Sequence, residues 1–307
     1  MPLQKYLMGL LLLWVTASAH GREVVIAFEN TLQPSSSLDG KARSQMLVRN
    51  MANAGVPQAL FLIQTRGINS KDKERLGLYS DAGHLLVNSG YYHNLVTKAD
   101  LYVFEIGILK ADRLLAQYTG YKQHVHFSYL NEFGDKNVQQ GLREFLRKRN
   151  YKPTFIGVNK MRGVDAYFDQ LYQAKIRANR KVDIVALEHA YVDFLVRSLN
   201  AEDAQAYMML GYSPRQVLVL QENDLAAYFI AALVERLESE HWTLLAAERA
   251  FSDPVVNPLL SSGFGGNGYM NSITGLGDEP VAYPRLLGAR KAQADTYIQH
   301  AIPALMP

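Results

Sequence analysis

The sequence predicts an α/β protein whose strands run parallel. Short apolar runs rich in Val, Ile and Leu alternate with segments of helical spacing from Glu23 to about Asp253. Strands that alternate with helices in this way are typical of parallel sheets covered by helices. An open doubly wound sheet would show the same alternation, but no G-x-G-x-x-G motif follows the first strand, so its dinucleotide-binding version has no support.

The first unit consists of a strand at 23–28, a polar loop at 34–40 and a helix at 41–54. Later units repeat this order along the chain. We expect further strands at 59–63, 85–87, 124–130, 154–158 and 216–220, and helices at 70–81, 100–115, 137–149, within 165–199 and at 225–237. Ser70 is the expected N-cap of its helix, because a hydroxyl there accepts a backbone N–H.

The alternation stops after Asp253. The stretch 261–268 contains too many glycines for a helix or a central strand, and a helix is expected again at 286–300. We therefore divide the mature chain into a main domain at 20–254 and a loop-rich tail with a terminal helix at 255–307. The tail either covers the main domain or forms a lid over its mouth.

The first nineteen residues have the pattern of a secretory signal peptide. Lys5 precedes an apolar run at 6–15, and Ala17-Ser18-Ala19 provides small residues for cleavage before His20. The run is shorter than the roughly 20 residues that a membrane span needs. We expect an exported protein, periplasmic or secreted, without a membrane span after cleavage, and the absence of cysteine excludes disulfides and a lipid-modified cysteine.

The mature charge is almost balanced. Lys5 leaves with the signal peptide, so 31 basic residues remain against 29 acidic ones. The basic cluster at 143–149 lies at the end of an expected helix, where cations complement the helix dipole. Without a basic stripe, the sequence gives no support to a nucleic-acid partner.

Three segments outside any catalytic motif carry a family resemblance. They are Gly55-Val56-Pro57-Gln58-Ala59-Leu60-Phe61, Asp81-Ala82-Gly83-His84, and the strand, helix and closing Asp-Pro at 216–254. From Val24 to Pro254 the chain resembles the polysaccharide deacetylases, the NodB-like proteins of carbohydrate esterase family 4. The resemblance implies a NodB-type distorted (β/α) barrel with parallel strands, followed by an irregular C-terminal tail. It also implies a metal-dependent hydrolase that removes N-acetyl groups.

The family's metal motifs are altered here. Where the first strand of the family reads F-D-D-G, this chain has Phe28-Glu29-Asn30-Thr31, so Glu29 takes the position of the catalytic base and Asn30 that of a metal ligand. The histidines of the motif H-[ST]-x-x-H correspond to Asn88 and Tyr92. A shift of one residue would place His93 at one of these two positions, but no register supplies both histidines.

The remaining motifs are altered too. The family's R-x-P-[FY] corresponds to 126–129, with His126 in place of the arginine and Tyr129 at the aromatic position. The aspartate–tryptophan motif falls at Asn159 to Asp165. Gln221 replaces the histidine that acts as general acid in the family.

These substitutions suggest a binding protein in place of an enzyme. A catalytic zinc ion needs about three imidazole or anionic ligands, and amides or a phenol are poor substitutes. Our leading hypothesis is therefore a metal-free pseudoenzyme that binds an envelope or extracellular glycan, such as an exopolysaccharide or a peptidoglycan fragment. The expected glycan-binding residues offer amides, an imidazole and aromatic faces: Asn30, Asn88, Tyr91, Tyr92, His126, Tyr129 and Asn159.

Two alternatives remain open. The first is an active N-deacetylase that holds zinc or another divalent ion with the rewired ligands Glu29, His93 and His126, which the strand ends would bring to one face of the barrel. The second is a structural protein of an envelope complex, which would use the C-terminal tail and the Tyr91-Tyr92 surface to contact a protein partner.

Overall fold

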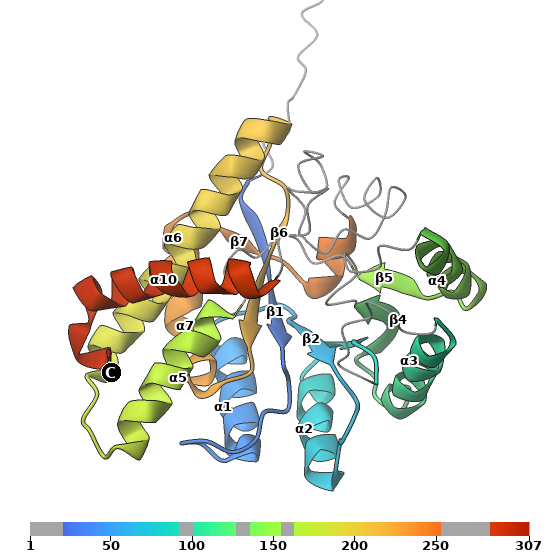
Figure 1. Ribbon diagram of the computed structural model, residues 1–307, viewed down its shortest axis with the longest axis horizontal. Coiled ribbons are helices and arrows are strands. Elements are labelled where there is room, and N and C mark those ends of the chain that lie inside the picture. The colour runs from blue at the N-terminus through green and yellow to red at the C-terminus, as the bar shows by residue number, and fades with distance from the viewer. Residues whose placement is uncertain (1–20, 92–100, 127–135, 155–162, 253–282, 307) are drawn as a thin grey trace, which may run out of the picture.

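A computed structural model describes residues 21–91, 101–126, 136–154, 163–252 and 283–306. In these ranges the strands form one parallel sheet in the order β5-β4-β3-β2-β1-β6, and β7 pairs with the start of β1 (Figure 1). The strands are β1 (Glu23–Glu29), β2 (Leu60–Ile63), β3 (Leu85–Asn88), β4 (Tyr121–His126), β5 (Lys152–Thr154), β6 (Gln216–Gln221) and β7 (Thr243–Leu244).

Strand β1 lies between β2 and β6, the strand at one edge of the sheet. It pairs with β6 from Val24 opposite Gln216 to Glu29 opposite Gln221. On its other side it pairs with β2. Since all neighbouring pairs are parallel, the carboxyl ends of these strands meet at one edge, where loops carry the functional groups of such folds.

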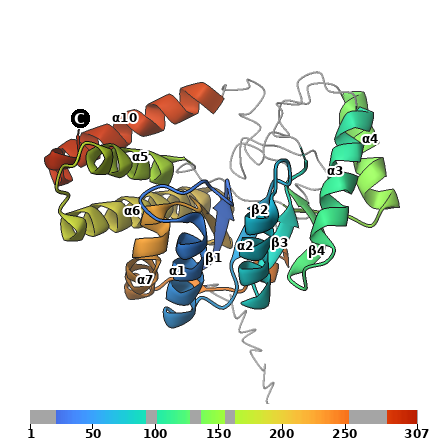
Figure 2. The ribbon, with the colours of Figure 1, turned by 90° about the horizontal axis from the view of Figure 1, so that it is seen from below.

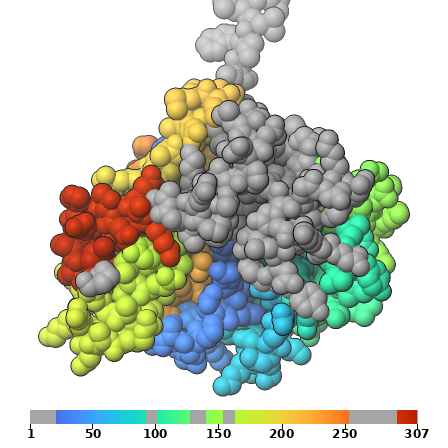
Figure 3. Space-filling view, in the orientation of Figure 1, coloured from blue at the N-terminus to red at the C-terminus, as the bar shows by residue number. Residues whose placement is uncertain are grey.

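Helices flank the sheet. Figure 1 shows α5, α6, α7 and α10 beside the β6 and β1 end and α3 and α4 beside the β4 and β5 end, and Figure 2 shows the same division from below. In the space-filling view, the blue segment that contains α1 reaches the surface between α5 and α2 (Figure 3). The helices are α1 (Gly40–Asn53), α2 (Ser70–Asp81), α3 (Leu101–Leu115), α4 (Lys136–Lys148), α5 (Val164–Arg177), α6 (Ile184–Leu210), α7 (Asp224–Ser239) and α10 (Tyr283–Ala301), with short 3-10 turns η2 (Ala247–Ser252) and η3 (Pro303–Leu305).

The two faces of the sheet have separate cores, because successive side chains of a strand point to opposite faces. Ile26 and Phe28 of β1 belong to a large apolar cluster that includes residues of α1, α2, α6 and α7. Val25 and Ala27 face a smaller cluster made mainly by neighbouring strands and by η2. One face of the sheet thus packs against helices, and the other face packs mainly against side chains of the neighbouring strands and of η2. This architecture confirms the α/β fold with parallel strands.

Some element boundaries differ from the expected ones. Helix α2 is capped by Asn69 and not by Ser70, because the Asn69 side chain accepts the backbone N–H of Lys71 and Asp72 while Asp72 accepts the N–H of Asn69. Strand β4 begins at Tyr121, before the expected position 124, and β5 begins at Lys152. Helix α6 continues to Leu210, where Gly211 ends it in a left-handed conformation.

The C-terminal helix packs onto the main core. Ala294, Ile298 and Ile302 are buried in the same cluster as β1 and α6. The described part of the tail therefore covers the main domain; residues 253–282 lie outside the described ranges. In the described ranges, no helix combines the length and apolar character that a bilayer crossing requires.

Candidate functional site

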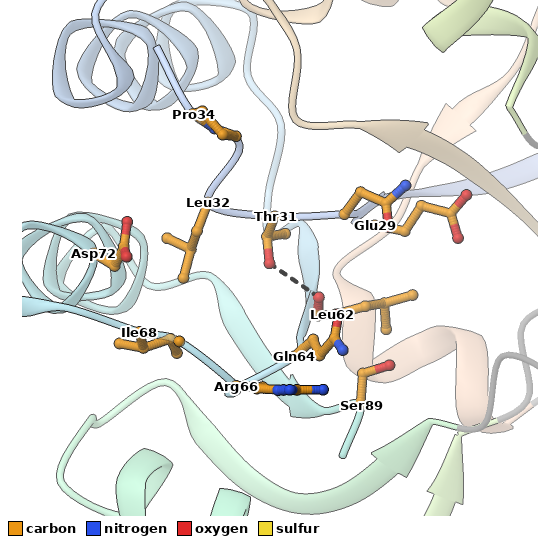
Figure 4. A pocket seen from close by; sticks show the side chains of 12 residues that line it. Glu29, Thr31, Leu32, Pro34, Leu62, Gln64, Arg66, Ile68, Asp72 and Ser89 are labelled. Carbon is orange, nitrogen blue, oxygen red and sulfur yellow. Dashed lines mark hydrogen bonds between the residues drawn. The ribbon is translucent and has the colours of Figure 1, made fainter. Parts of the chain in front are cut away.

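An open pocket of about 300 Å³ lies at the carboxyl ends of β1, β2 and β3 (Figure 4). Its polar lining comes from the segments that directly follow these strands and from the start of α2. These polar residues are Glu29, Asn30, Thr31, Gln64, Arg66, Asp72 and Ser89. The volume is at the lower end of the range for small-molecule sites.

Glu29 and Asn30 bring the first altered motif to this pocket. Glu29 is the last residue of β1 and is only 6% exposed, whereas Asn30 is exposed. Asn30 has φ 44°, a left-handed conformation that asparagine tolerates better than most residues. Thr31 then donates its hydroxyl to the carbonyl of Leu62 at 3.0 Å, which fastens the start of the loop to β2 (Figure 4).

Asp165 lies behind Glu29, near the start of α5. It is 1% exposed; its Oδ2 accepts the backbone N–H of Gln221 at 2.5 Å, and its Oδ1 has no hydrogen-bond partner among the described residues. Burial raises the pKa of Asp165 to about 7; the Gln221 N–H opposes this shift and the charge of Glu29 adds to it. Glu29, Asp165 and Gln221 thus meet where β1, β6 and α5 converge.

Asn88 lies deeper than the sequence suggests. It is fully buried, its Nδ2 donates to the carbonyl of Ile108 at 3.0 Å, and its Oδ1 accepts the N–H of Gly90 at 2.8 Å. It closes the turn after β3 and joins it to α3. Tyr91 is half-buried, with the Lys110 ammonium 5.2 Å from its ring centroid. Neither Asn88 nor Tyr91 is among the described residues that line the pocket.

The histidines of β4 are both largely enclosed. His126 ends the strand and is 6% exposed. Burial, followed by the charge of Lys152, lowers the pKa of His124, whose ring meets Phe251 edge-on at 4.7 Å. His124 is therefore part of the packing beneath the strand.

Two aromatic residues near the start of α5 have packing roles. Phe168 lies in the core against Tyr191, and Tyr167 donates its hydroxyl to Asp295 of α10. The remaining predicted positions fall outside the described ranges: Tyr92, His93, Tyr129 and Asn159. The described residues contain no group of three or more His, Cys, Asp or Glu side chains that could hold a metal ion.

A buried ion network beside the pocket was missed by the sequence analysis. Glu222 and Asp224, just after β6, bind Arg43 of α1 and Arg75 of α2. Each arginine shares its helix face with buried apolar side chains, as Arg43 does with Leu47. A charged residue within an apolar stripe is the signal that could have revealed it.

No protein-family model and no curated protein matches the sequence. Solved structures do match the fold. A mutant of BA3943, described as a family 4 carbohydrate esterase pseudoenzyme with restored enzymatic activity, superimposes with a TM-score of 0.51 at 10% identity, covering 76% of this chain and 69% of that one. A second BA3943 mutant, described as a pseudoenzyme of the same family, superimposes with a TM-score of 0.50 at 9% identity, covering 76% of this chain and 68% of that one.

A family 4 carbohydrate esterase from Streptomyces lividans, in complex with acetate, gives a TM-score of 0.45 at 17% identity over 74% and 92% of the two chains. The parallel sheet and the BA3943 superpositions agree with the resemblance read from the sequence motifs. The chain therefore has the fold of the NodB-like polysaccharide deacetylases, a fold shared by a described pseudoenzyme.

Proposed function

We propose that this chain is an exported polysaccharide deacetylase-like protein that binds a glycan in the pocket after β1 and does not carry out metal-dependent deacetylation. The observation that carries the proposal is the polar lining of this pocket. Asn30, Gln64 and Ser89 offer neutral hydrogen-bonding groups, and Arg66 offers a guanidinium. Such groups match the hydroxyl and acetamido groups of a sugar.

The donor set does not fit a catalytic zinc ion. At two of the positions that the family gives to metal ligands, the described residues are Asn30 and Asn88. A neutral amide is a weak ligand, and both amide atoms of Asn88 already bond to backbone groups inside the protein. Glu29 remains at the position of the base, but a carboxylate alone does not polarise an acetamide carbonyl.

The mode of binding that we propose differs from the one expected from the sequence. None of the described lining residues is aromatic; the apolar part of the wall consists of Leu32, Pro34, Leu62 and Ile68. We therefore assign recognition mainly to hydrogen bonds and exclude Asn88 from direct contact. An exopolysaccharide or a peptidoglycan fragment remains the proposed ligand class.

The decisive experiment measures metal content, acetate release and binding on the same preparation. We expect no stoichiometric metal, no acetate from chitohexaose, and binding of this oligosaccharide that survives a chelator. Gln64→Ala should weaken binding about tenfold, the effect of losing one or two hydrogen bonds to a ligand. The matched control is Gln140→Ala, at an exposed glutamine on α4.

Stoichiometric zinc together with acetate release that Glu29→Gln abolishes would overturn this proposal in favour of the rewired ligands Glu29, His93 and His126. Absence of binding to any glycan, with a protein co-purifying from the envelope, would support the structural alternative. Export is tested separately: the mature protein should be recovered from the periplasm or medium with an N-terminus near His20.

A further inference from the structure

Two residues of the loop that forms one wall of the pocket have a left-handed backbone conformation. This loop, the pocket loop, comprises residues 30–39 between β1 and α1. Asn30 has φ 44° and Leu32 has φ 65°. For Leu32 this conformation is strained, because its Cβ approaches the following carbonyl oxygen. Strained residues persist only where surrounding contacts impose their conformation.

Those contacts come from the buried ion network. Glu222 accepts the backbone N–H of Leu32 at 2.5 Å. The carbonyl of Gln33 accepts hydrogen bonds from Arg43 at 2.5 Å and from Arg75 at 3.0 Å. The turn at 32–33 is therefore held from both sides, by a carboxylate on its N–H and by guanidinium groups on its carbonyl.

The second half of the pocket loop is attached to the other acid of the network. Asp224 accepts the hydroxyl of Ser36 at 2.7 Å and the backbone N–H of Leu38 at 3.0 Å. Gln173 links the pocket loop to Asp224, because its side chain accepts a hydrogen bond from the hydroxyl of Ser37 at 2.6 Å and donates one to Asp224 at 2.8 Å. The loop is thus bonded to its support at several points along its length.

The network is enclosed and balanced in charge. Arg75 donates to both oxygens of Glu222 at 2.7 Å, and Arg43 donates to Asp224 at 3.0 Å and to Glu222 at 3.3 Å. The four side chains are at most 4% exposed. A buried ion pair adds little stability over apolar packing because removing charges from water is costly, but its bonds fix directions. Fixing the pocket loop is a role that apolar side chains could not fill.

We propose that Glu222 and Asp224, with Arg43 and Arg75, are positioning residues that hold the pocket loop in its strained, ligand-competent shape. None of the four lines the pocket; they act through Leu32 and Pro34, which do. This inference rests on the proposed function for its ligand, but the shape of the loop is tested without one.

The principal variant is Glu222→Gln, which keeps the size of the side chain and removes its charge. The matched control is Asp203→Asn, a buried carboxylate that also pairs with an arginine, Arg22, close to the first residue of β1 and away from the pocket. Both variants are expected to lower thermal stability. Only Glu222→Gln should speed amide hydrogen exchange in residues 30–39 relative to β1, and only it should weaken chitohexaose binding, by tenfold or more.

A rescue experiment separates positioning from general stability. Glycine adopts the left-handed conformation freely, so Leu32→Gly removes the need for support at this residue. Glu222→Gln should therefore weaken chitohexaose binding much less in the Leu32→Gly background than in the wild type, a non-additivity expected only if the two residues are coupled.

Exchange in residues 30–39 that is equal in Glu222→Gln and Asp203→Asn would overturn the positioning role. If wild-type protein does not bind chitohexaose, the glycan proposed above fails for this probe, and the exchange comparison still decides the role of the network. Faster exchange confined to the pocket loop then supports it without any ligand.

Discussion

Replacing Asp165 by asparagine should stabilise the protein, and more strongly at alkaline pH. Burial raises the pKa of this carboxyl from 3.8 to about 7. The folded-state pKa lies above the unfolded value, so the contribution of Asp165 to stability is fully present below pH 3.8 and is lost as the pH rises through about 7. The asparagine carries no such charge at any pH.

The size of the effect follows from the two pKa values. Ionising Asp165 destabilises the folded protein by about 4 kcal/mol at pH 8 and about 2 kcal/mol at pH 5. The amide oxygen of Asp165→Asn can still accept the N–H of Gln221. Its NH₂ group lies where Oδ1 has no partner among the described residues, at a cost of about 1 kcal/mol at either pH.

Urea unfolding at pH 5 and pH 8 measures the cost of ionising Asp165 together with the cost of the unpaired amide. The variant should gain about 3 kcal/mol at pH 8 and little at pH 5, and the constant cost of the amide cancels in the difference between the two conditions. Asp81→Asn, at an exposed position at the end of α2, is the control and should show no gain on this scale. A gain in Asp165→Asn that is equal at the two pH values would refute the reasoning.

Further predictions concern local geometry and are measured by urea unfolding. Asn69→Ala should lower the free energy of unfolding by about 1 kcal/mol because it removes the cap of α2, whereas Ser70→Ala should be nearly neutral or slightly stabilising. A larger loss in Ser70→Ala than in Asn69→Ala would restore Ser70 as the cap. Gly120→Ala should lose about 3 kcal/mol, because a Cβ would lie 2.3 Å from the backbone carbonyl oxygen of His84. Gly77→Ala, in open space on α2, should gain up to about 1 kcal/mol, and equal effects of the two alanines would contradict the contacts described.

The sequence predicted the central strands well because burial on both faces leaves a simple pattern. The apolar run of β1 has the length and the β-branched residues that are typical of a short buried strand. Strand β4 was placed too late because its first residues lack an apolar pattern: Lys122 and Gln123 are exposed, and only Val125 and His126 are buried. The cap of α2 was misassigned although Asp72 follows Asn69 by three residues, which is the spacing of a capping box.

The candidate site was predictable only in part. Glu29 and Asn30 were found because they directly follow a buried strand and match a motif. Gln64 and Arg66 follow β2 in the same way, but no motif marks them. Asn88 was placed in the right strand end, yet the depth of its side chain depends on α3, which packs over it. Sequence spacing indicates at which edge of the sheet a residue lies, but not how deeply its side chain is buried.

The residues at the family's metal-ligand positions and the residues that hold the pocket loop are different sets. The charges of Arg43, Arg75, Glu222 and Asp224 compensate one another inside the protein, so the pocket loop needs no cation in the pocket to keep its shape. Substitution at Asn30 changes the chemistry offered to a ligand but leaves this support intact. Because the two sets are separate, a chain with this fold can carry different residues at the metal-ligand positions and keep a pocket of defined form.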